Sequence, residues 1–341
     1  MPTIEDLKNY QSLPLDLKVE LTQDRIRQFL EVFGPEGTYI SFSGGKDSTV
    51  LLHLVRDIAP TVPALFVNTG LEYPEIQSFV KTFDNVEIVR PKMLFPEVIK
   101  KYGYPFISKE ASKNVYYARR SGPNGIHYKK LFGIDDFEKS RFATTKYIPL
   151  YTADFMISNN CCDIMKKAPA HAYETRTKRK PFTGQMASES LLRRQKWLQF
   201  GCNAFDNKHV VSNPLSFWTD QDVLRFIKAN GIKIASVYGD IVQEDPDGYG
   251  YDQTFGDICP YKTTGCDRTG CIFCGFGAHL EKGEGRFVRL KRTHPKQYDY
   301  CMSGGAYDPE DGLWKPNEKG LGMAHCIDEM NKIFGKDFIK Y

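Results

Sequence analysis

The six residues from 43 to 48 constrain the fold more than any other part of the chain. They read Ser43-Gly44-Gly45-Lys46-Asp47-Ser48, and they separate a predicted buried strand, 38–42, from a predicted apolar helix, 48–55. Two glycines permit positive φ and let backbone N–H groups approach a phosphate, and the helix N-terminus behind them adds partial positive charge. The hydroxyls of Ser43 and Ser48 add two donors. We therefore predict a phosphate-binding loop.

The two charged residues of this loop suggest how it would act. Lys46 offers a full positive charge and, because it follows two glycines at the mouth of a turn, we expect its side chain to reach solvent or ligand rather than the core. Asp47 would repel phosphate unless it binds Mg²⁺ or orients the loop. The pattern Gly-x4-Gly-Lys-Ser/Thr is missing, so this is not the P-loop of kinases and GTPases.

Apolar periodicity around the loop predicts an α/β fold. Helical spacing covers 20–33, 48–55 and 74–83, and these segments alternate with short apolar strands at 38–42, 64–67 and 86–89. Such alternation favours a doubly wound parallel sheet covered on both faces. Two more helices are predicted at 188–200 and 220–229. Residues 102–151, rich in Lys, Arg, Tyr and Gly, are interpreted as a long insertion near the site.

Composition and the order of apolar residues restrict the cellular location and the domain division that we predict. The chain has 341 residues, a net charge of +4 and nine cysteines. The N-terminus lacks the layout of a signal peptide and no apolar run approaches a membrane span, so we predict a cytoplasmic protein with no membrane partner. After Gly239 the composition shifts towards Gly, Asp, Cys and Lys. We predict a nucleotide-binding domain over 1–240 and a Cys-rich, metal-binding segment over 241–341, poor in periodic structure.

Several segments together resemble a known family. The sequence Ser-Gly-Gly-Lys-Asp-Ser resembles the PP-loop of the adenine nucleotide alpha hydrolases, in particular the PAPS reductase branch. Similar order follows in Asn68-Thr69-Gly70, in the segment from Gly184 to Ser190, and in the run Pro214-Leu215, Trp218-Thr219 and Asp222-Val223. The resemblance covers about residues 35–240. It implies a doubly wound α/β sheet that binds ATP, APS or PAPS at the carboxyl ends of its strands.

The resemblance also implies the site residues. Lys46 and Asp47 would be catalytic. The nucleotide would contact residues of the loop, of the two following strand ends and of the segment after Gly184; these are Ser41, Ser43, Gly44, Gly45, Lys46, Asp47, Ser48, Asn68, Thr69, Gly70, Gly184 and Glu189.

Two departures from the family pattern guide the choice of activity. Position 186 is Met where the family often has Arg, and the tail after Gly335 has no cysteine, which leaves Cys326 as the nearest nucleophile for a reductase. The intact loop looks more like the ATP-using relatives. We therefore expect an ATP pyrophosphatase that uses Mg²⁺, adenylates an acceptor and supports sulfur transfer from a sulfur donor. The alternatives are a thiol-dependent APS or PAPS reductase, with a thiol reductant as partner, and a non-enzymatic nucleotide-sensing module.

The cysteines suggest a metal site. Cys271-Ile272-Phe273-Cys274 has a spacing that suits Zn²⁺ or an iron–sulfur cluster, and Cys266 lies five residues upstream. The adjacent pair Cys161-Cys162 followed by a distant Cys-x-x-Cys resembles the motif of iron–sulfur APS reductases. That resemblance implies a [4Fe–4S] centre on Cys161, Cys162, Cys271 and Cys274. A set that includes Cys266, structural zinc, and free or redox-active thiols remain alternatives, and Cys259 adds to them.

Three basic runs leave room for an anionic acceptor. They lie within 113–130, 176–180 and 286–296, and the first is interleaved with tyrosines. Solvated surface is one interpretation of each run. A nucleic acid or another polyanion as acceptor is the other, since tyrosines among cations can stack on exposed bases.

Overall fold

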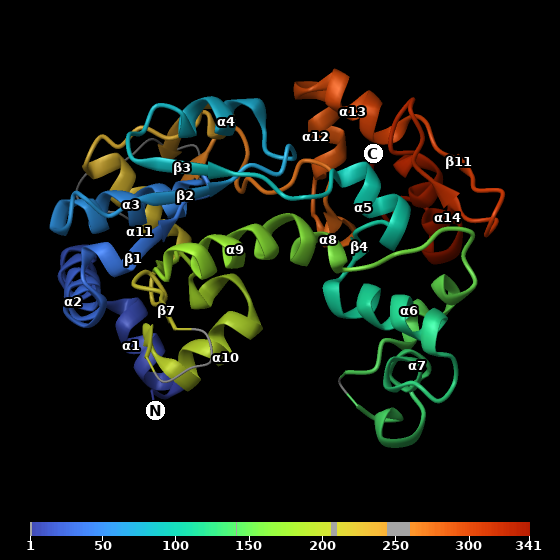
Figure 1. Ribbon diagram of the computed structural model, residues 1–341, viewed down its shortest axis with the longest axis horizontal. Coiled ribbons are helices and arrows are strands. Elements are labelled where there is room, and N and C mark those ends of the chain that lie inside the picture. The colour runs from blue at the N-terminus through green and yellow to red at the C-terminus, as the bar shows by residue number, and fades with distance from the viewer. Residues whose placement is uncertain (1, 141, 206–209, 244–259) are drawn as a thin grey trace, which may run out of the picture. The chain divides into compact units, whose positions relative to one another are not determined.

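The computed structural model describes residues 2–140, 142–205, 210–243 and 260–341, and it divides the chain into two compact units (Figure 1). Unit 1 comprises residues 1–68, 72–90 and 170–269, and unit 2 comprises residues 69–71, 91–169 and 270–341. These units differ from the predicted division at residue 240. Each unit is assembled from distant parts of the chain, and contacts between such parts leave no mark in local composition.

Unit 1 contains a six-stranded sheet in the order β3-β2-β1-β5-β7-β6. The strands are β1 (Thr38–Ser41), β2 (Ala64–Val67), β3 (Val86–Val89), β5 (Lys180–Phe182), β6 (Asn203–Ala204) and β7 (Val211–Ser212). All neighbours are parallel except β6 and β7. The chain builds outwards from β1 through β2 to β3 and then returns to β5 on the other side of β1. This reversal confirms the predicted doubly wound, mainly parallel α/β sheet.

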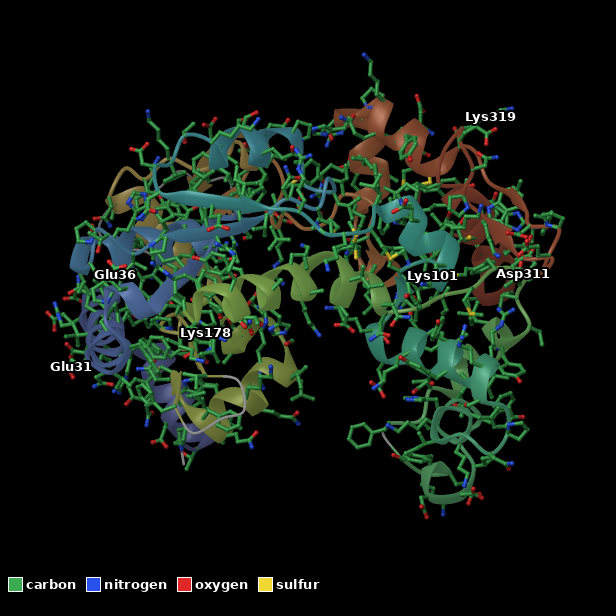
Figure 2. The ribbon with its side chains drawn as sticks, in the orientation of Figure 1. Glu31, Glu36, Lys101, Lys178, Asp311 and Lys319 are labelled. Carbon is green, nitrogen blue, oxygen red and sulfur yellow. The ribbon has the colours of Figure 1, made fainter. Side chains whose placement is uncertain are left out.

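Both faces of the sheet are covered. Successive side chains of a strand point to opposite faces, and apolar side chains lie on each face. On one face Tyr39 and Leu65 pack against Tyr173 of α9 (Ala168–Thr177). On the other face the ring of Phe182 contacts that of Phe29, with centroids 5.0 Å apart, on α2 (Leu15–Phe33). Figure 1 shows α9 running past the sheet in green. In Figure 2, Glu31 and Glu36 lie outside this core, at the end of α2 and in the turn before β1.

The remaining elements of unit 1 support the sheet. They are α1 (Ile4–Ser12), α3 (Lys46–Ile58), α4 (Pro74–Val80), α10 (Leu191–Phe200), α11 (Asp220–Ala229) and the hairpin of β8 (Ile241–Gln243) and β9 (Tyr261–Thr263). Helix α11 begins with a capping box, because the Thr219 side chain accepts from the Asp222 N–H and the Asp222 carboxylate accepts from the Thr219 N–H. The predicted strands 64–67 and 86–89 and the predicted helix 220–229 are confirmed to the residue.

Unit 2 is mostly helical. Its helices are α5 (Phe95–Tyr102), α6 (Lys109–Ser121), α7 (Ile126–Phe132), α8 (Asn160–Cys162), α12 (Arg286–Thr293), α13 (Pro295–Met302) and α14 (Met323–Phe334). Two short pairs complete it, parallel β4 (Phe106–Ile107) with β10 (Gly275–Phe276), and antiparallel β11 (Ala306–Tyr307) with β12 (Trp314–Lys315).

The expectation that residues after 240 are poor in periodic structure is wrong. Helix α14 buries Met323, Cys326, Ile327 and Met330, a spacing of three to four residues that fits one face of a helix. The stretch 102–151 is likewise better ordered than predicted, because α6 buries Ala111, Val115 and Ala118 at the same spacing. Among the described residues, no helix combines the length and the apolarity that crossing a membrane requires.

Candidate nucleotide site

The loop of residues 43–48 follows the carboxyl end of β1, where the strand order reverses. Gly44 has φ +71°, and Lys46 begins α3 instead of the predicted Ser48, because Gly45 forms the N-cap. The hydroxyls of Ser43 and Ser48 lie 3.0 Å apart, and the Ser48 hydroxyl also donates to the Gly45 carbonyl at 2.9 Å. The two serines therefore hold the shape of the loop, in addition to any contact with a ligand.

Lys46 does not reach solvent as expected, because its side chain is 2% exposed. Its Nζ lies 2.5 Å from Oδ1 of Asp220 on α11 and 3.2 Å from Oδ1 of Asp47. Burial alone would lower the pKa of Lys46, but the charge of Asp47 and the hydrogen bond and charge of Asp220 outweigh it and raise the pKa above its ordinary value. Lys46 is thus a permanent cation between two carboxylates.

The hydroxyl of a buried tyrosine contacts the backbone at the N-terminus of α3. The backbone N–H of Lys46 donates to the hydroxyl of Tyr238 at 3.1 Å, and this hydroxyl lies 2.7 Å from Oγ1 of Thr269. Burial raises the pKa of Tyr238, so the phenol stays neutral and can accept this bond. Sequence reasoning missed both residues, since nothing local distinguishes them. Through these two hydrogen bonds, Tyr238 links Thr269 to the loop.

Two arginines bring further positive charge to the loop. Glu189 is paired with both Arg193 of α10 and Arg268, and its carboxylate also accepts the Met186 N–H at 2.9 Å. Burial and the neighbouring Arg268 lower the pKa of Arg193, whereas the charge of Asp47 raises it. Arg193 therefore lies within electrostatic reach of the loop. The Arg268 side chain is 59% exposed and available to an anion.

The lack of an arginine at position 186 does not leave the loop without neighbouring cations. Met186 is 1% exposed and offers no charge, but Arg193 and Arg268 supply cations next to the loop. Arg193 follows Glu189 by one helical turn, a spacing that could have identified it. Arg268 has no such signal, because 79 residues separate it from Glu189.

The remaining residues that we predicted to contact the nucleotide belong partly to unit 1 and partly to unit 2. A Cβ on Gly184 would lie 3.2 Å from the carbonyl oxygen of Asp47, so this glycine packs directly on the loop. Ser41 ends β1 and is exposed. Asn68 belongs to unit 1, where its N–H donates to Val89 at 2.8 Å, whereas Thr69 and Gly70 belong to unit 2.

Four of the predicted metal ligands share unit 2. Cys161 and Cys162 form α8, and the Cys274 N–H donates to the Cys271 carbonyl at 3.0 Å in a tight turn. The hydrogen bond between the adjacent thiols raises the pKa of Cys161 and lowers that of Cys162, and the charges of Cys274 and Cys271 raise the pKa of Cys161 further. The four thiols therefore lie within electrostatic reach of one another, and soft thiolates suit iron–sulfur or zinc chemistry.

The metal assignment itself stays a prediction. Within the described ranges no three His, Cys, Asp or Glu side chains are arranged to hold a metal ion. Cys266 belongs to unit 1, where its N–H donates to Val237 at 3.0 Å, and Cys259 lies outside the described residues.

Comparison with known proteins identifies the family. The family model "Phosphoadenosine phosphosulfate reductase domain" matches residues 37–108 and 126–275. The chain belongs to this family. The match includes the loop, Gly184, Glu189, both arginines and the four cysteines predicted to bind a cluster.

Two relatives align with different shares of this chain. A phosphoadenosine 5'-phosphosulfate reductase from Xylella fastidiosa is 30% identical over 96 residues, which are 27% of this chain and 40% of that protein. An uncharacterized protein from Methanocaldococcus jannaschii is 22% identical over 299 residues, which are 86% of this chain and 54% of that protein. The chain thus spans between two fifths and just over half the length of these relatives.

A solved structure to which this chain is similar is the phosphate complex of a phosphoadenylyl-sulfate reductase from Candida auris. The alignment covers 69% of this chain and 91% of that one, with 17% identity and a TM-score of 0.38.

The predicted reductase nucleophile is deeply buried in this family member. Cys326 is 0% exposed on α14, and burial raises its pKa well above the ordinary value of a thiol. A nucleophilic cysteine needs access and thiolate character, and Cys326 has neither in this structure.

Several residues of the predicted basic runs form ion pairs. In the first run Lys129 contacts Asp135 and Lys130 contacts Glu110. In the third, Arg286 contacts Glu281 and Arg292 contacts Glu284. These pairs fit a solvated surface, and a nucleic-acid acceptor stays a prediction.

Proposed function

We propose that this chain is an enzyme that binds ATP against the loop 43–48, cleaves it between the α- and β-phosphates and adenylates an acceptor as a step in sulfur transfer. The observation that carries the proposal is the charge arrangement around the loop. Lys46 is held between Asp47 and Asp220, with Arg193 and Arg268 beside them. A triphosphate requires positive side chains around its oxygens, and the divalent cation bound to it requires carboxylates.

The residues have distinct roles in this proposal. An acceptor oxygen that has lost its proton forms a bond to the α-phosphorus, the bond to the bridging oxygen breaks, and pyrophosphate leaves with the electron pair. Lys46, Arg193, Arg268 and the loop N–H groups stabilise the charge that develops on the phosphate oxygens. Asp47 and Asp220 are carboxylates of the kind that hold Mg²⁺ together with phosphates, and this metal would neutralise the leaving group.

Four cysteines of unit 2 support a second proposal, because soft thiolates are the ligands that iron–sulfur clusters take. Cys161, Cys162, Cys271 and Cys274 would hold an iron–sulfur cluster, which would supply electron transfer or sulfur chemistry. Lys109 and Lys166 lie near Cys162, and cations of this kind stabilise thiolate ligands.

Reduction of PAPS or APS by a thiol is the second candidate. The names of the relatives favour it, since several of them are phosphoadenosine 5'-phosphosulfate reductases. The burial of Cys326 weighs against it, because a reductase of this kind needs a nucleophilic cysteine that substrate can reach.

A comparison of substrates separates the two candidates. Purified protein is incubated with ATP and Mg²⁺, with APS, and with PAPS in the presence of a dithiol, and AMP, pyrophosphate and sulfite are measured. We expect AMP and pyrophosphate from ATP once an acceptor is present, and tighter binding of ATP than of APS or PAPS. Sulfite release, together with binding of PAPS at least tenfold tighter than ATP, a difference of about 1.4 kcal/mol, would establish the reductase instead.

A matched pair of arginine variants tests the site itself. Arg268→Met removes an exposed cation that is paired only through Glu189 in the described structure, so ATP affinity should fall about tenfold with little change in stability. Arg27→Met is the control, because Arg27 is exposed on α2 and pairs with Asp24. Equal ATP affinity in the two variants would remove Arg268 from the site.

A further inference from the structure

Unit 1 contains a cavity formed by residues that the proposed function does not use. It has a volume of about 290 Å³. Five aromatic side chains contribute to its walls, from α1, from α10 and from the segments after α10; they are Tyr10, Trp197, Phe200, Phe205 and Phe217. The ring of Tyr10 meets that of Trp197 edge-on, with centroids 6.1 Å apart, and lies 5.5 Å from that of Phe217. The wall is therefore suited to the face of an aromatic ring.

One buried hydrogen-bond donor in this wall has no strong acceptor among the described residues. Trp197 is 4% exposed, and its indole Nε1 has no hydrogen-bond partner among the residues that the structure describes. The sulfur of Cys202, which also lines the cavity, lies within reach of the Trp197 indole N–H and of the Arg25 guanidinium. Burial raises the pKa of Cys202, so it remains a neutral thiol and a weak acceptor. A buried donor that meets only a weak acceptor costs free energy until a ligand supplies a stronger one.

The same wall carries a cation without a counter-charge. Arg25 of α2 lines the cavity and donates through Nη1 to the neutral Oε1 of Gln28 at 3.0 Å. It forms no ion pair within the described part of the chain, whereas Arg27, two residues later, pairs with Asp24 at 3.0 Å. A guanidinium beside aromatic rings, next to an N–H that has only a weak sulfur acceptor, forms a receptor for a carboxylate.

We propose that this cavity binds a small aromatic monocarboxylate. The carboxylate would accept from the Arg25 guanidinium and the Trp197 indole N–H, and the ring would lie against Tyr10 and Phe217. The volume supports a ligand with a single ring, since it lies just below the roughly 300–1,000 Å³ found for small-molecule pockets. The site shares no residue with the loop 43–48 or with the arginines beside it. It is therefore a second site, independent of the nucleotide.

Calorimetric titration of the full chain tests this with three probes. Phenylacetate has both the ring and the carboxylate, 2-phenylethanol has the ring alone, and inorganic sulfate is an anion without a ring. We expect saturable, one-to-one binding of phenylacetate with a Kd below about 1 mM, and binding of the other two at least tenfold weaker. The result should be the same in the presence of ATP.

Two variants and one control locate the ligand. Trp197→Phe keeps a ring but removes the N–H, and Arg25→Met keeps the length of the side chain but removes the charge; each should weaken phenylacetate binding at least tenfold. Arg27→Met on the same helix should leave it unchanged. If Trp197→Phe fails to fold, Arg25→Met still decides the matter, because Arg25 is only partly buried.

Several results would overturn the proposal. Phenylacetate that shows no saturable binding up to about 10 mM would do so. Sulfate that binds as tightly as phenylacetate would show a plain anion site, and 2-phenylethanol that does so would show an apolar one. Competition between phenylacetate and ATP would place the ligand in the nucleotide site instead.

Discussion

Lys46 joins two elements that are 174 positions apart in sequence. Its ammonium group pairs with Asp220 at the start of α11 and with Asp47 at the start of α3. Each carboxylate also lies at a helix N-terminus, where negative charge is favoured. A single buried cation therefore stabilises the loop and aligns two carboxylates next to the place where phosphate would bind.

Lys46→Ala should reduce both function and stability. Removal of the ammonium group leaves two carboxylates facing each other, so we expect a loss of about 1–3 kcal/mol, less than for a fully buried pair because Asp220 is more than half exposed. The pKa of Lys46 is raised, so this contribution is present below about pH 10.4 and is lost only as pH rises through the folded pKa.

Urea unfolding and ATP titration of the same protein measure both effects. Lys8→Ala serves as the control, because Lys8 is exposed and its ion pair with Glu5 is 3.7 Å long, so its loss should change stability by less than about 0.5 kcal/mol. Equal midpoints for the two variants would show that the buried pair contributes nothing.

The cysteines of unit 2 give a second prediction at this scale. Anaerobically purified protein should be brown and contain about four irons per chain, and Cys271→Ser or Cys274→Ser should bleach it. Cys202→Ser should leave the colour and the iron unchanged, because Cys202 is in unit 1 and lines the aromatic cavity. Colourless protein with one tightly bound zinc would disprove the cluster.

At the scale of elements, the turn from β1 into α3 depends on a glycine. Gly44 has φ +71°, and a Cβ at this position would lie 2.7 Å from a methyl group of Val80 and 2.8 Å from one of Ile76, both on α4. The turn is thus restricted both by backbone conformation and by the helix packed on it. This leaves no room for a side chain between the loop and α4.

Gly44→Ala should therefore be more harmful than an ordinary substitution at positive φ. Gly34 offers a matched control, because it has φ +67° and an added Cβ would have no atom of the described residues within 4 Å. We expect Gly34→Ala to cost about 1–2 kcal/mol from backbone strain alone, and Gly44→Ala to cost about 1–3 kcal/mol more from steric overlap. Chemical denaturation of both variants measures the difference. Equal losses would mean that α4 yields to the extra methyl group.

At the scale of the whole molecule, both units contain histidines that folding keeps neutral. Burial lowers the pKa of His53 in unit 1 and of His127 and His279 in unit 2. The unfolded chain, with histidine pKa values of about 6.5, therefore binds more protons in mild acid than the folded chain does. Stability is fully present above about pH 6.5 and is lost as pH falls through the lower folded values.

The free energy of unfolding should accordingly fall between pH 7.5 and pH 5.5. The carboxylates with lowered pKa, Asp6, Asp308 and Glu284, titrate below this window, since their ordinary values are 3.8 and 4.5. His53→Phe should flatten the dependence, because the new ring can keep the edge-on contact with Phe83. Urea midpoints at the two pH values provide the measurement. A midpoint that is unchanged or higher in acid, or an equal slope in the variant, would contradict this account.

Local features determined the centre of the fold. Strands 64–67 and 86–89, helix 220–229 and the loop 43–48 could be predicted because short apolar runs, a capping box and a glycine pair act over a few residues. The alternation of these elements also indicated the doubly wound sheet, since parallel strands need crossover helices. The order of the loop and the later motifs was enough to identify the family.

Only the tertiary structure decided which distant residues complete the site and how the chain divides. Asp220, Tyr238 and Arg268 reach the loop or Glu189 across 79 to 192 positions, and contacts of this length follow from the path of the sheet rather than from any local pattern. The same cause explains why Lys46 is buried although its neighbours suggest exposure. It also explains why the units interleave at residues 69–71, 91, 170 and 270. Local sequence fixes secondary structure through spacing and capping, whereas burial and charge pairing arise only when separate elements pack together.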